Sequence, residues 1–280
     1  MIKEDFHKEQ SKERQLYGLT EDDQQKMVGQ FPDKKYYEFI NHIWLENKPG
    51  DVLDLWNQWL PYVSDFWTYP IKDLVRYKKM LVDNQSLIKD KRIADIGSDL
   101  GFGLLLSLHL GAKHCIGLEP VARKNELASL ILDKAGYGNF TLFEGQIKDQ
   151  DVWSEMKDLD TVILGSVLDV IADHYRLIEN VAKTKAQDII IDGREDRSHA
   201  ESETPWINWK VGRTPFQKGS FNNDVQHPFY GEPNRAFVTM LMSEFGYQLD
   251  EQSFYEFIHF SSPEPMLRSV SIYSKKEGGK

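Results

Sequence analysis

The spacing of apolar side chains along this chain changes near residue 89. Between residues 34 and 84 they recur at helical intervals, as at Val52, Leu55 and Trp59. Prolines at positions 49, 61 and 70 interrupt this pattern, because proline lacks a backbone donor and disfavours helix in the preceding residue. Residues 1–30 are polar and charged and show no sustained apolar period. We therefore expect residues 1–88 to form a charged arm followed by a helical cap.

Short β-rich runs and longer amphipathic stretches alternate after residue 89. The predicted strands are Arg92–Ile96, His114–Leu118, Phe140–Phe143, Thr161–Leu164 and Asp188–Ile191. The predicted helices between them are Phe102–Leu110, Ala122–Lys134, Asp151–Lys157 and Val170–Lys183. This alternation predicts a doubly wound α/β fold, with a mostly parallel sheet covered by helices on both faces.

The alternation stops after the fifth predicted strand. Residues 193–231 are polar and aromatic and too long for a routine connection, which predicts an insertion that serves as a substrate lid. A helix is predicted at Pro233–Phe245, with proline at its opening and glycine just past its end. The strands Ser253–Phe260 and Leu267–Ser274 follow, and their short connection permits only an antiparallel pair. We expect residues 89–280 to form one domain around a seven-stranded sheet with an antiparallel last strand.

Composition narrows the class of protein. The 280 residues include 34 Lys and Arg against 44 Asp and Glu, a formal net charge of −10. An acidic average surface disfavours nonspecific binding to nucleic acid or anionic membranes and favours a protein that handles small molecules. The single cysteine, Cys115, excludes an internal disulfide and a cysteine-based zinc site. The charged first thirty residues do not resemble a signal peptide, and no apolar stretch reaches the roughly 20 residues that span a bilayer. We expect a cytoplasmic protein without membrane attachment.

The segment from Arg92 to Gly103 carries the most specific chemical signal. A predicted strand passes into a turn with Gly97 and Gly101 and then into a helix, so a ligand can approach the backbone beside the positive end of that helix. Glu119 ends the next predicted strand, 22 residues after Gly97, where an acidic side chain accepts hydrogen bonds from ribose hydroxyls. Pro120 suits the opening of the following helix. Together these features predict a nucleoside-type ligand.

This segment resembles the first motif of the class I S-adenosylmethionine-dependent methyltransferases, acid-x-Gly-x-Gly-x-Gly. Asp95, Gly97 and Gly101 match the motif, and the resemblance covers about residues 91–276. It implies a Rossmann-like domain with S-adenosylmethionine as cofactor. Residues 97–101, including Ser98, would hold the methionine end of that cofactor, and Glu119 would contact its ribose.

The resemblance has one departure and two further matches. Asp99 stands where the family has its middle glycine; aspartate tolerates left-handed backbone angles, and its carboxylate either faces the cofactor's ammonium group or is an exposed turn residue. After the third strand, Gly145 and Gln146 match the segment that contacts the adenine amino group, for which the Gln146 carbonyl is an acceptor. After the fourth strand, Leu164–Ile171, with Ser166, resembles the small-residue segment beneath the transferred methyl group. Helix capping is the alternative role for Ser166.

Missing motifs disfavour several methyl acceptors. The Asp/Asn-Pro-Pro-aromatic motif of amino-methylating DNA enzymes is replaced by Gly165 to Leu168, and the Pro-Cys nucleophile of cytosine-C5 enzymes is absent. The acid that metal-dependent relatives place after the fourth strand is a glycine, and no two histidines are spaced His-x-x-x-His, so we expect no metal. The expected acceptor is a small-molecule hydroxyl or amine, followed by a protein side chain and then RNA.

Methyl transfer from a sulfonium is driven largely by alignment of acceptor, methyl group and sulfur, and a base is required only where the acceptor keeps its proton. Among the candidate bases in the insertion, His199 is our single choice. Aromatic residues of the insertion and of the N-terminal unit, Trp67 and Tyr69 in particular, are candidates for an acceptor pocket, with core packing as the alternative.

Two other readings stay open at this point. The glycine spacing also fits short-chain dehydrogenases, but none of the twelve tyrosines is followed four residues later by the required lysine. A non-catalytic scaffold or regulatory protein that kept the cofactor fold is the second, because a fold by itself does not establish turnover. The sequence does not determine the oligomeric state.

Overall fold

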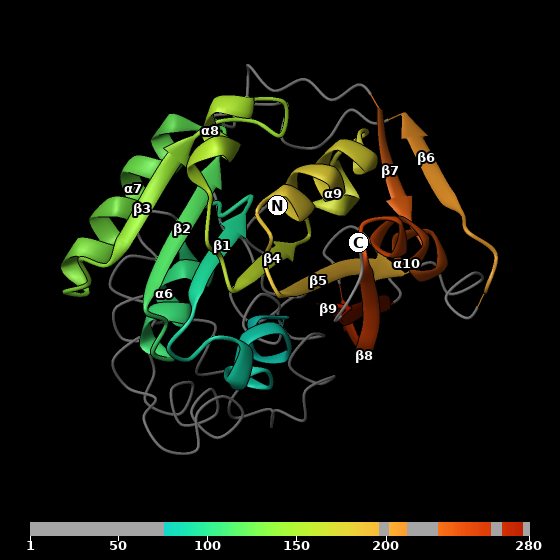
Figure 1. Ribbon diagram of the computed structural model, residues 1–280, viewed down its shortest axis with the longest axis horizontal. Helices are drawn as coiled ribbons and strands as arrows, with labels where there is room; N and C mark the ends of the chain where they lie inside the picture. The colour runs from blue at the N-terminus through green and yellow to red at the C-terminus, as the bar shows by residue number, and fades with distance from the viewer. Residues whose placement is uncertain (1–75, 196–201, 212–228, 259–264, 277–280) are drawn as a thin grey trace, which may run out of the picture. The chain divides into compact units, whose positions relative to one another are not determined.

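A computed structural model describes residues 76–195, 202–211, 229–258 and 265–276 (Figure 1). The chain divides into two compact units, residues 1–83 with 256–266 and residues 84–255 with 267–280. In the first unit, the described part contains a π-helical turn, Lys78–Val82, in which Met80 and Leu81 are buried. The helices predicted before residue 76, with Trp67 and Tyr69, lie outside the described residues.

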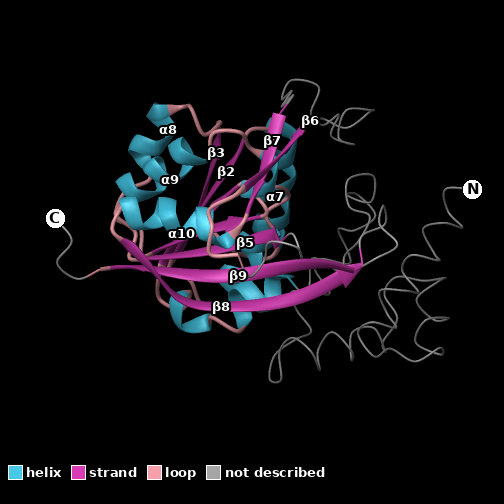
Figure 2. Ribbon diagram, turned by 90° about the vertical axis from the view of Figure 1, so that its right-hand side faces the viewer, coloured by secondary structure: helices cyan, strands magenta, loops and turns pink. Residues whose placement is uncertain are grey.

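A seven-stranded sheet forms the centre of the second unit, in the order β3-β2-β1-β4-β5-β9-β8. Its strands are β1 (Arg92–Ile96), β2 (His114–Glu119), β3 (Phe140–Glu144), β4 (Thr161–Gly165), β5 (Asp188–Glu195), β8 (Tyr247–Ile258) and β9 (Pro265–Lys275). Strands β1 to β5 pair in parallel, whereas β9 pairs antiparallel with β5. Figure 2 shows β8 and β9 side by side. The predicted doubly wound fold with an antiparallel last strand is confirmed.

Helices cover both faces of this sheet. They are α6 (Phe102–His109), α7 (Ala122–Lys134), α8 (Gln150–Glu155), α9 (His174–Lys183) and α10 (Arg235–Glu244), with 3-10 turns at Gln85–Leu87 and Leu168–Val170. Buried side chains of α8, α9 and α10 pack with alternate residues of the strands in one core. Helices α6 and α7 contact each other and strands β1, β2 and β3. No helix in the described ranges is long and apolar enough to cross a membrane.

Capping side chains correct the predicted starts of two helices. The helix predicted from Val170 begins at His174, because the Asp173 side chain accepts the N–H of Arg176 and so caps α9. The helix predicted from Pro233 begins at Arg235, because Asn234 accepts the N–H of Phe237. Pro233 is instead the last residue of a strand.

The boundaries of the predicted insertion also change. Strand β5 continues to Glu195, and Gly193 pairs with Ser269 of β9, so the first three residues assigned to the insertion belong to the sheet. The described part of the insertion forms a two-stranded antiparallel ribbon of β6 (Ile207–Val211) and β7 (Phe229–Pro233). Strand β8 starts at Tyr247, six residues before its predicted start at Ser253.

Candidate functional site

The turn between β1 and α6 uses two glycines in conformations that other residues rarely adopt. Gly97 has φ +74° and Gly101 has φ +79°. A Cβ atom at Gly97 would lie 2.7 Å from Val167 Cγ2, and one at Gly101 would lie 2.8 Å from Ala128 Cβ. The turn thus approaches both the segment after β4 and helix α7 so closely that side chains are excluded. Both glycines are therefore required by the local geometry of the turn itself.

Asp99, in the middle of this turn, adopts the left-handed conformation with φ +49°. Its carboxylate, which is 35% exposed, forms an ion pair with the ammonium group of Lys124 on α7. Asp99 is thus a partly exposed turn residue with a side-chain partner, and a contact with the cofactor's ammonium group stays a prediction. The Lys124 side chain is 16% exposed. Burial lowers the pKa of Lys124, but Asp99 and Glu119 outweigh that effect and raise it above its ordinary value.

Glu119, at the end of β2, lies directly against this turn. One carboxylate oxygen accepts the N–H of Asp99 at 3.2 Å, and the other accepts the N–H of Val121 at 3.2 Å. Lys124 Nζ is 4.0 Å from the second oxygen. Burial raises the pKa of Glu119 to about 7, although Lys124 and the two N–H donors act in the opposite direction. This carboxyl group is thus poised to change its charge near neutral pH.

Neighbouring predicted residues gather at the same carboxyl edge of the sheet. Asp95, in β1, and Ser98, in the turn, are both buried. Asn125 of α7 donates to the carbonyl oxygens of Glu119 and Phe143, which joins the ends of β2 and β3.

The two remaining positions near this edge flank helices α7 and α8. Pro120 does not open helix α7 but precedes its N-cap residue, Val121. After β3, the N–H of Gln146 donates to Asp149 at 2.7 Å, and a Cβ at Gly145 would lie 2.9 Å from Val152.

Ser166, directly after β4, belongs to a buried polar cluster that the sequence did not predict. It has φ +58°, and its hydroxyl donates to Asp192 at 3.2 Å. The Arg268 guanidinium contacts both Asp192 oxygens and Ser166 Oγ. Tyr255 donates to Asp192 as well. Asp192 is 0% exposed and Arg268 is 2% exposed. The residues stand at the carboxyl ends of β4 and β5 and on β8 and β9.

Charged contacts continue from this cluster to the β6–β7 ribbon. Asp169 lies 3.3 Å from Arg268 and accepts the N–H of Arg194 at 3.0 Å. Arg194 in turn binds Glu232 of β7 at 3.2 Å. Acidic and arginine side chains alternate along this series of contacts, in the order Asp192, Arg268, Asp169, Arg194 and Glu232. Asp169 thus pairs with both arginines.

His174, the first residue of α9, fixes the ribbon at a second point. Its Nε2 lies 2.9 Å from the carbonyl oxygen of Leu168 and 3.2 Å from that of Gly231 in β7. Its ring meets those of Trp209 and Phe237 edge-on, with centroids 6.1 and 6.0 Å apart. Two carbonyl oxygens require a donor, so Nε2 carries the proton.

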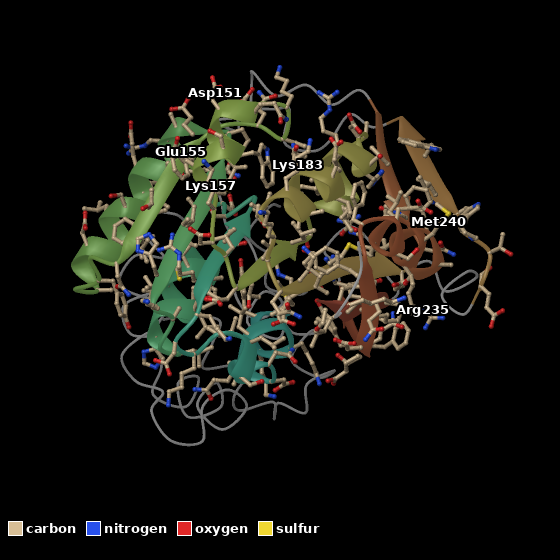
Figure 3. All side chains as sticks on the ribbon, in the orientation of Figure 1. Asp151, Glu155, Lys157, Lys183, Arg235 and Met240 are labelled. Atoms are coloured by element: carbon tan, nitrogen blue, oxygen red, sulfur yellow. The ribbon has the colours of Figure 1, made fainter. Side chains whose placement is uncertain are left out.

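The structure does not place every predicted site residue. His199 lies outside the described residues, so its role as a base stays a prediction. Within the described residues, no group of three His, Cys, Asp or Glu side chains has the arrangement of a metal site. The charged residues Asp151, Glu155 and Lys183, labelled in Figure 3, are exposed on α8 and α9 and take no part in the contacts above.

Comparison with curated proteins gives short matches. No protein-family model matches the sequence. Protein arginine N-methyltransferase 1 of Oryza sativa subsp. indica is 31% identical over 83 residues, which cover 28% of this chain and 21% of the rice protein. The protein of the same name from Saccharomyces cerevisiae is 30% identical over 83 residues, 28% of this chain and 24% of the yeast protein. The match therefore spans less than a quarter of these relatives.

Solved structures match over much more of the chain. A proposed RNA methyltransferase from Pyrococcus horikoshii superposes with a TM-score of 0.52 at 17% identity, over 74% of this chain and 85% of that chain. A SAM-dependent methyltransferase from Methanosarcina mazei superposes with a TM-score of 0.52 at 14% identity, over 74% of this chain and 97% of that chain. The N-terminal domain of EvdMO1 with SAH bound superposes with a TM-score of 0.50 at 14% identity, over 67% of this chain and 75% of that chain. This chain therefore has the fold of the class I SAM-dependent methyltransferases, as the sequence predicted.

Proposed function

We propose that this protein binds S-adenosylmethionine and transfers its methyl group to an acceptor. The observation that carries the proposal is the arrangement of Gly97, Gly101 and Glu119. A glycine turn held in left-handed conformations opens α6, and a buried acid at the end of β2 contacts that turn through Asp99 N–H. A dinucleotide or nucleoside cofactor with a ribose diol is what such an edge binds.

The residues present fit this cofactor. The α6 N-cap, Gly101, has no side chain that could cover the start of that helix, and a helix N-terminus favours a carboxylate such as that of the methionine moiety. The Ser98 hydroxyl is buried and has no hydrogen-bond partner among the described residues, which makes it a further candidate contact. Each Glu119 oxygen uses one lone pair on a backbone N–H and keeps one for a ribose hydroxyl.

When bound, the cofactor would supply an electrophilic methyl group on a positively charged sulfur. The chain's own contribution is to orient that group at the carboxyl ends of β4 and β5 and to exclude water there. Asp192 is held by Arg268, Tyr255 and Ser166, so it serves structure and local charge rather than proton transfer. The proposed reaction is metal-independent and rests on alignment, with His199 as the candidate base for acceptors that keep their proton.

A small-molecule hydroxyl or amine is the proposed acceptor. The long insertion after β5, with its β6–β7 ribbon joined to the carboxyl edge through Glu232 and Gly231, offers a wall for a compact pocket. A protein side chain is the alternative, and the similarity to protein arginine N-methyltransferase 1 favours it. The expected location is the cytoplasm.

Calorimetry with S-adenosylmethionine, S-adenosylhomocysteine and NADH tests the cofactor first. We expect micromolar binding of the first two and none of NADH. Transfer of a labelled methyl group to a small-molecule library and to arginine-rich peptides then separates the acceptor classes. Binding of neither sulfur compound would refute the proposal. Tight binding without transfer to any acceptor would favour the non-catalytic scaffold.

A further inference from the structure

Lys124 stands between two carboxylates and is bonded to only one of them. Its ammonium group contacts Asp99, whereas it stays 4.0 Å from Glu119. Both acids are near enough to attract it. The side chains of Lys124 and Glu119 are 16% and 6% exposed, so solvent screens this pair weakly, whereas Asp99 is 35% exposed. A substitution at this site can therefore change which of the two carboxylates Lys124 pairs with.

Asp99 is present at a position where glycine would meet the backbone requirement more easily. Its φ of +49° lies in the left-handed region, which costs a non-glycine residue about 1 kcal/mol. The resemblance to the methyltransferase motif places glycine there, and glycine has no side chain to bind a lysine. The aspartate side chain thus needs an explanation beyond the turn, and its ion pair with Lys124 supplies one.

Glu119 would lose one of its two remaining acceptor sites if Lys124 moved to it. Two backbone N–H groups, of Asp99 and Val121, already occupy one acceptor site on each oxygen. An ammonium group at hydrogen-bonding distance would take another, and it would compete directly with a ribose hydroxyl for it. With Lys124 Nζ 4.0 Å away, the positive charge still attracts the Glu119 carboxylate, but the ammonium group does not occupy an acceptor site on its oxygens.

We propose that Asp99 is a positioning residue that holds Lys124 away from Glu119, so that the Glu119 carboxylate is left to receive the ribose hydroxyls of the cofactor. This inference rests on the proposed function, because it assigns a role to the turn in cofactor binding. It also accounts for the departure from the glycine motif: the aspartate and the lysine form a matched pair.

A double-mutant cycle tests this pair without knowledge of the methyl acceptor. Calorimetry measures the affinity of S-adenosylhomocysteine for the wild type, Asp99→Gly, Lys124→Met and the double variant. We expect Asp99→Gly to weaken binding about tenfold, since neighbouring charged residues commonly couple by that amount. Removal of Lys124 raises the pKa of Glu119, so the variants are compared at pH 8.5, where this carboxylate is ionised. Lys124→Met should there change the affinity little, and the double variant should bind within about threefold of the wild type.

Two further readouts separate this role from a merely structural one. S-adenosylhomocysteine without its 2′-hydroxyl should lose less affinity in Asp99→Gly than the complete compound does, because the competition is for a ribose contact. The binding of the complete compound to Asp99→Gly should also vary less between pH 6 and 8, because a bonded lysine keeps Glu119 ionised. Urea unfolding of each variant controls for folding.

The outcomes are distinct. Full affinity in Asp99→Gly, or losses in the two single variants that simply add in the double variant, would overturn the positioning role while leaving the proposed cofactor intact. Failure of the wild type to bind S-adenosylhomocysteine would overturn both the proposed function and the inference that rests on it.

Discussion

The Arg268 guanidinium on β9 and the Asp192 carboxylate on β5 form a two-point ion pair in the interior, with Nε 3.1 Å from Oδ1 and the second nitrogen on Oδ2. Both side chains are almost fully removed from solvent. The pair joins the last parallel strand to the antiparallel strand at the edge where the methyl group would be transferred. Burial lowers the pKa of Arg268, but Asp192, Tyr255 and Asp169 outweigh that effect and raise it well above its ordinary value, so this side chain stays charged.

Removal of one partner should be far more damaging than removal of both. Arg268→Met leaves the buried Asp192 charge without its cation, which costs about 3–5 kcal/mol in comparable pairs. We expect a free energy of unfolding lower by that amount in urea titrations at pH 7. The control is Arg268→Met combined with Asp192→Asn, which should recover most of the loss. Equal destabilisation of the single and double variants would contradict a role for charge pairing here.

Gly97→Ala should destabilise the protein through two separable effects. The φ of +74° strains any residue with a Cβ, and the added methyl group would lie 2.7 Å from Val167 Cγ2. We expect the free energy of unfolding to fall by about 2–4 kcal/mol. Cofactor binding should also be weakened. Gly136 provides the matched control, since its φ is +80° and an added Cβ meets nothing within 4 Å. Gly136→Ala should therefore show the strain alone, about 1–2 kcal/mol. Equal losses in the two variants would show that contact with Val167 is unimportant.

The sequence predicted the strands of the sheet well because each is a short apolar run. All five predicted parallel strands are present, and the glycine turn with Glu119 lies where the motif indicated. The start of α9 was predicted less well. Apolar spacing placed it at Val170, whereas the N-cap residue Asp173, a local signal in the sequence, marks the actual start. A capping residue four positions inside a predicted helix deserves more weight than one apolar side chain before it.

The buried ion-pair cluster could not be derived in the same way. Asp192 and Arg268 are separated by 76 positions in the sequence, and only the tertiary fold brings them together. One signal was available: Arg268 lies between the apolar residues Leu267 and Val270 of a predicted strand, and a buried arginine requires an acidic partner. The sequence does not indicate which acid it is, because several follow the ends of the parallel strands.

The stability of the cofactor-free protein should fall as pH rises from about 4.5 to 7. Burial raises the pKa of Glu119 from 4.5 to about 7, so in this window the folded state holds a proton that the unfolded state has lost. The contribution to the unfolding free energy is complete below 4.5 and is lost as pH passes 7, and it amounts to about 3 kcal/mol. Urea midpoints at half-unit pH intervals measure it.

Two variants isolate this effect. Glu119→Gln cannot titrate, so its stability curve should lack the part of the decline that Glu119 contributes, whatever its absolute stability. Glu195→Gln tests a second buried carboxyl group, within the described residues, whose pKa burial raises, and the Glu119 decline should persist in it. Binding of S-adenosylhomocysteine should strengthen over the same pH range in the wild type and in Glu195→Gln but not in Glu119→Gln, because an ionised carboxylate is the better acceptor for ribose hydroxyls. A pH-independent affinity would mean that Glu119 does not contact the ribose.

His174→Phe should loosen the β6–β7 ribbon without unfolding the sheet. Phenylalanine can retain the edge-on contacts with Trp209 and Phe237, but it leaves the carbonyl oxygens of Leu168 and Gly231 without their Nε2–H donor. Each lost bond costs about 1 kcal/mol. Among the described residues, the N–H of Gly231 on the carbonyl oxygen of Ile171 also attaches the ribbon. We expect amide hydrogen exchange to accelerate about tenfold or more in β7 while β1 and β4 keep their protection. Uniform acceleration across the sheet would instead indicate that His174 stabilises the whole core rather than the attachment of the ribbon.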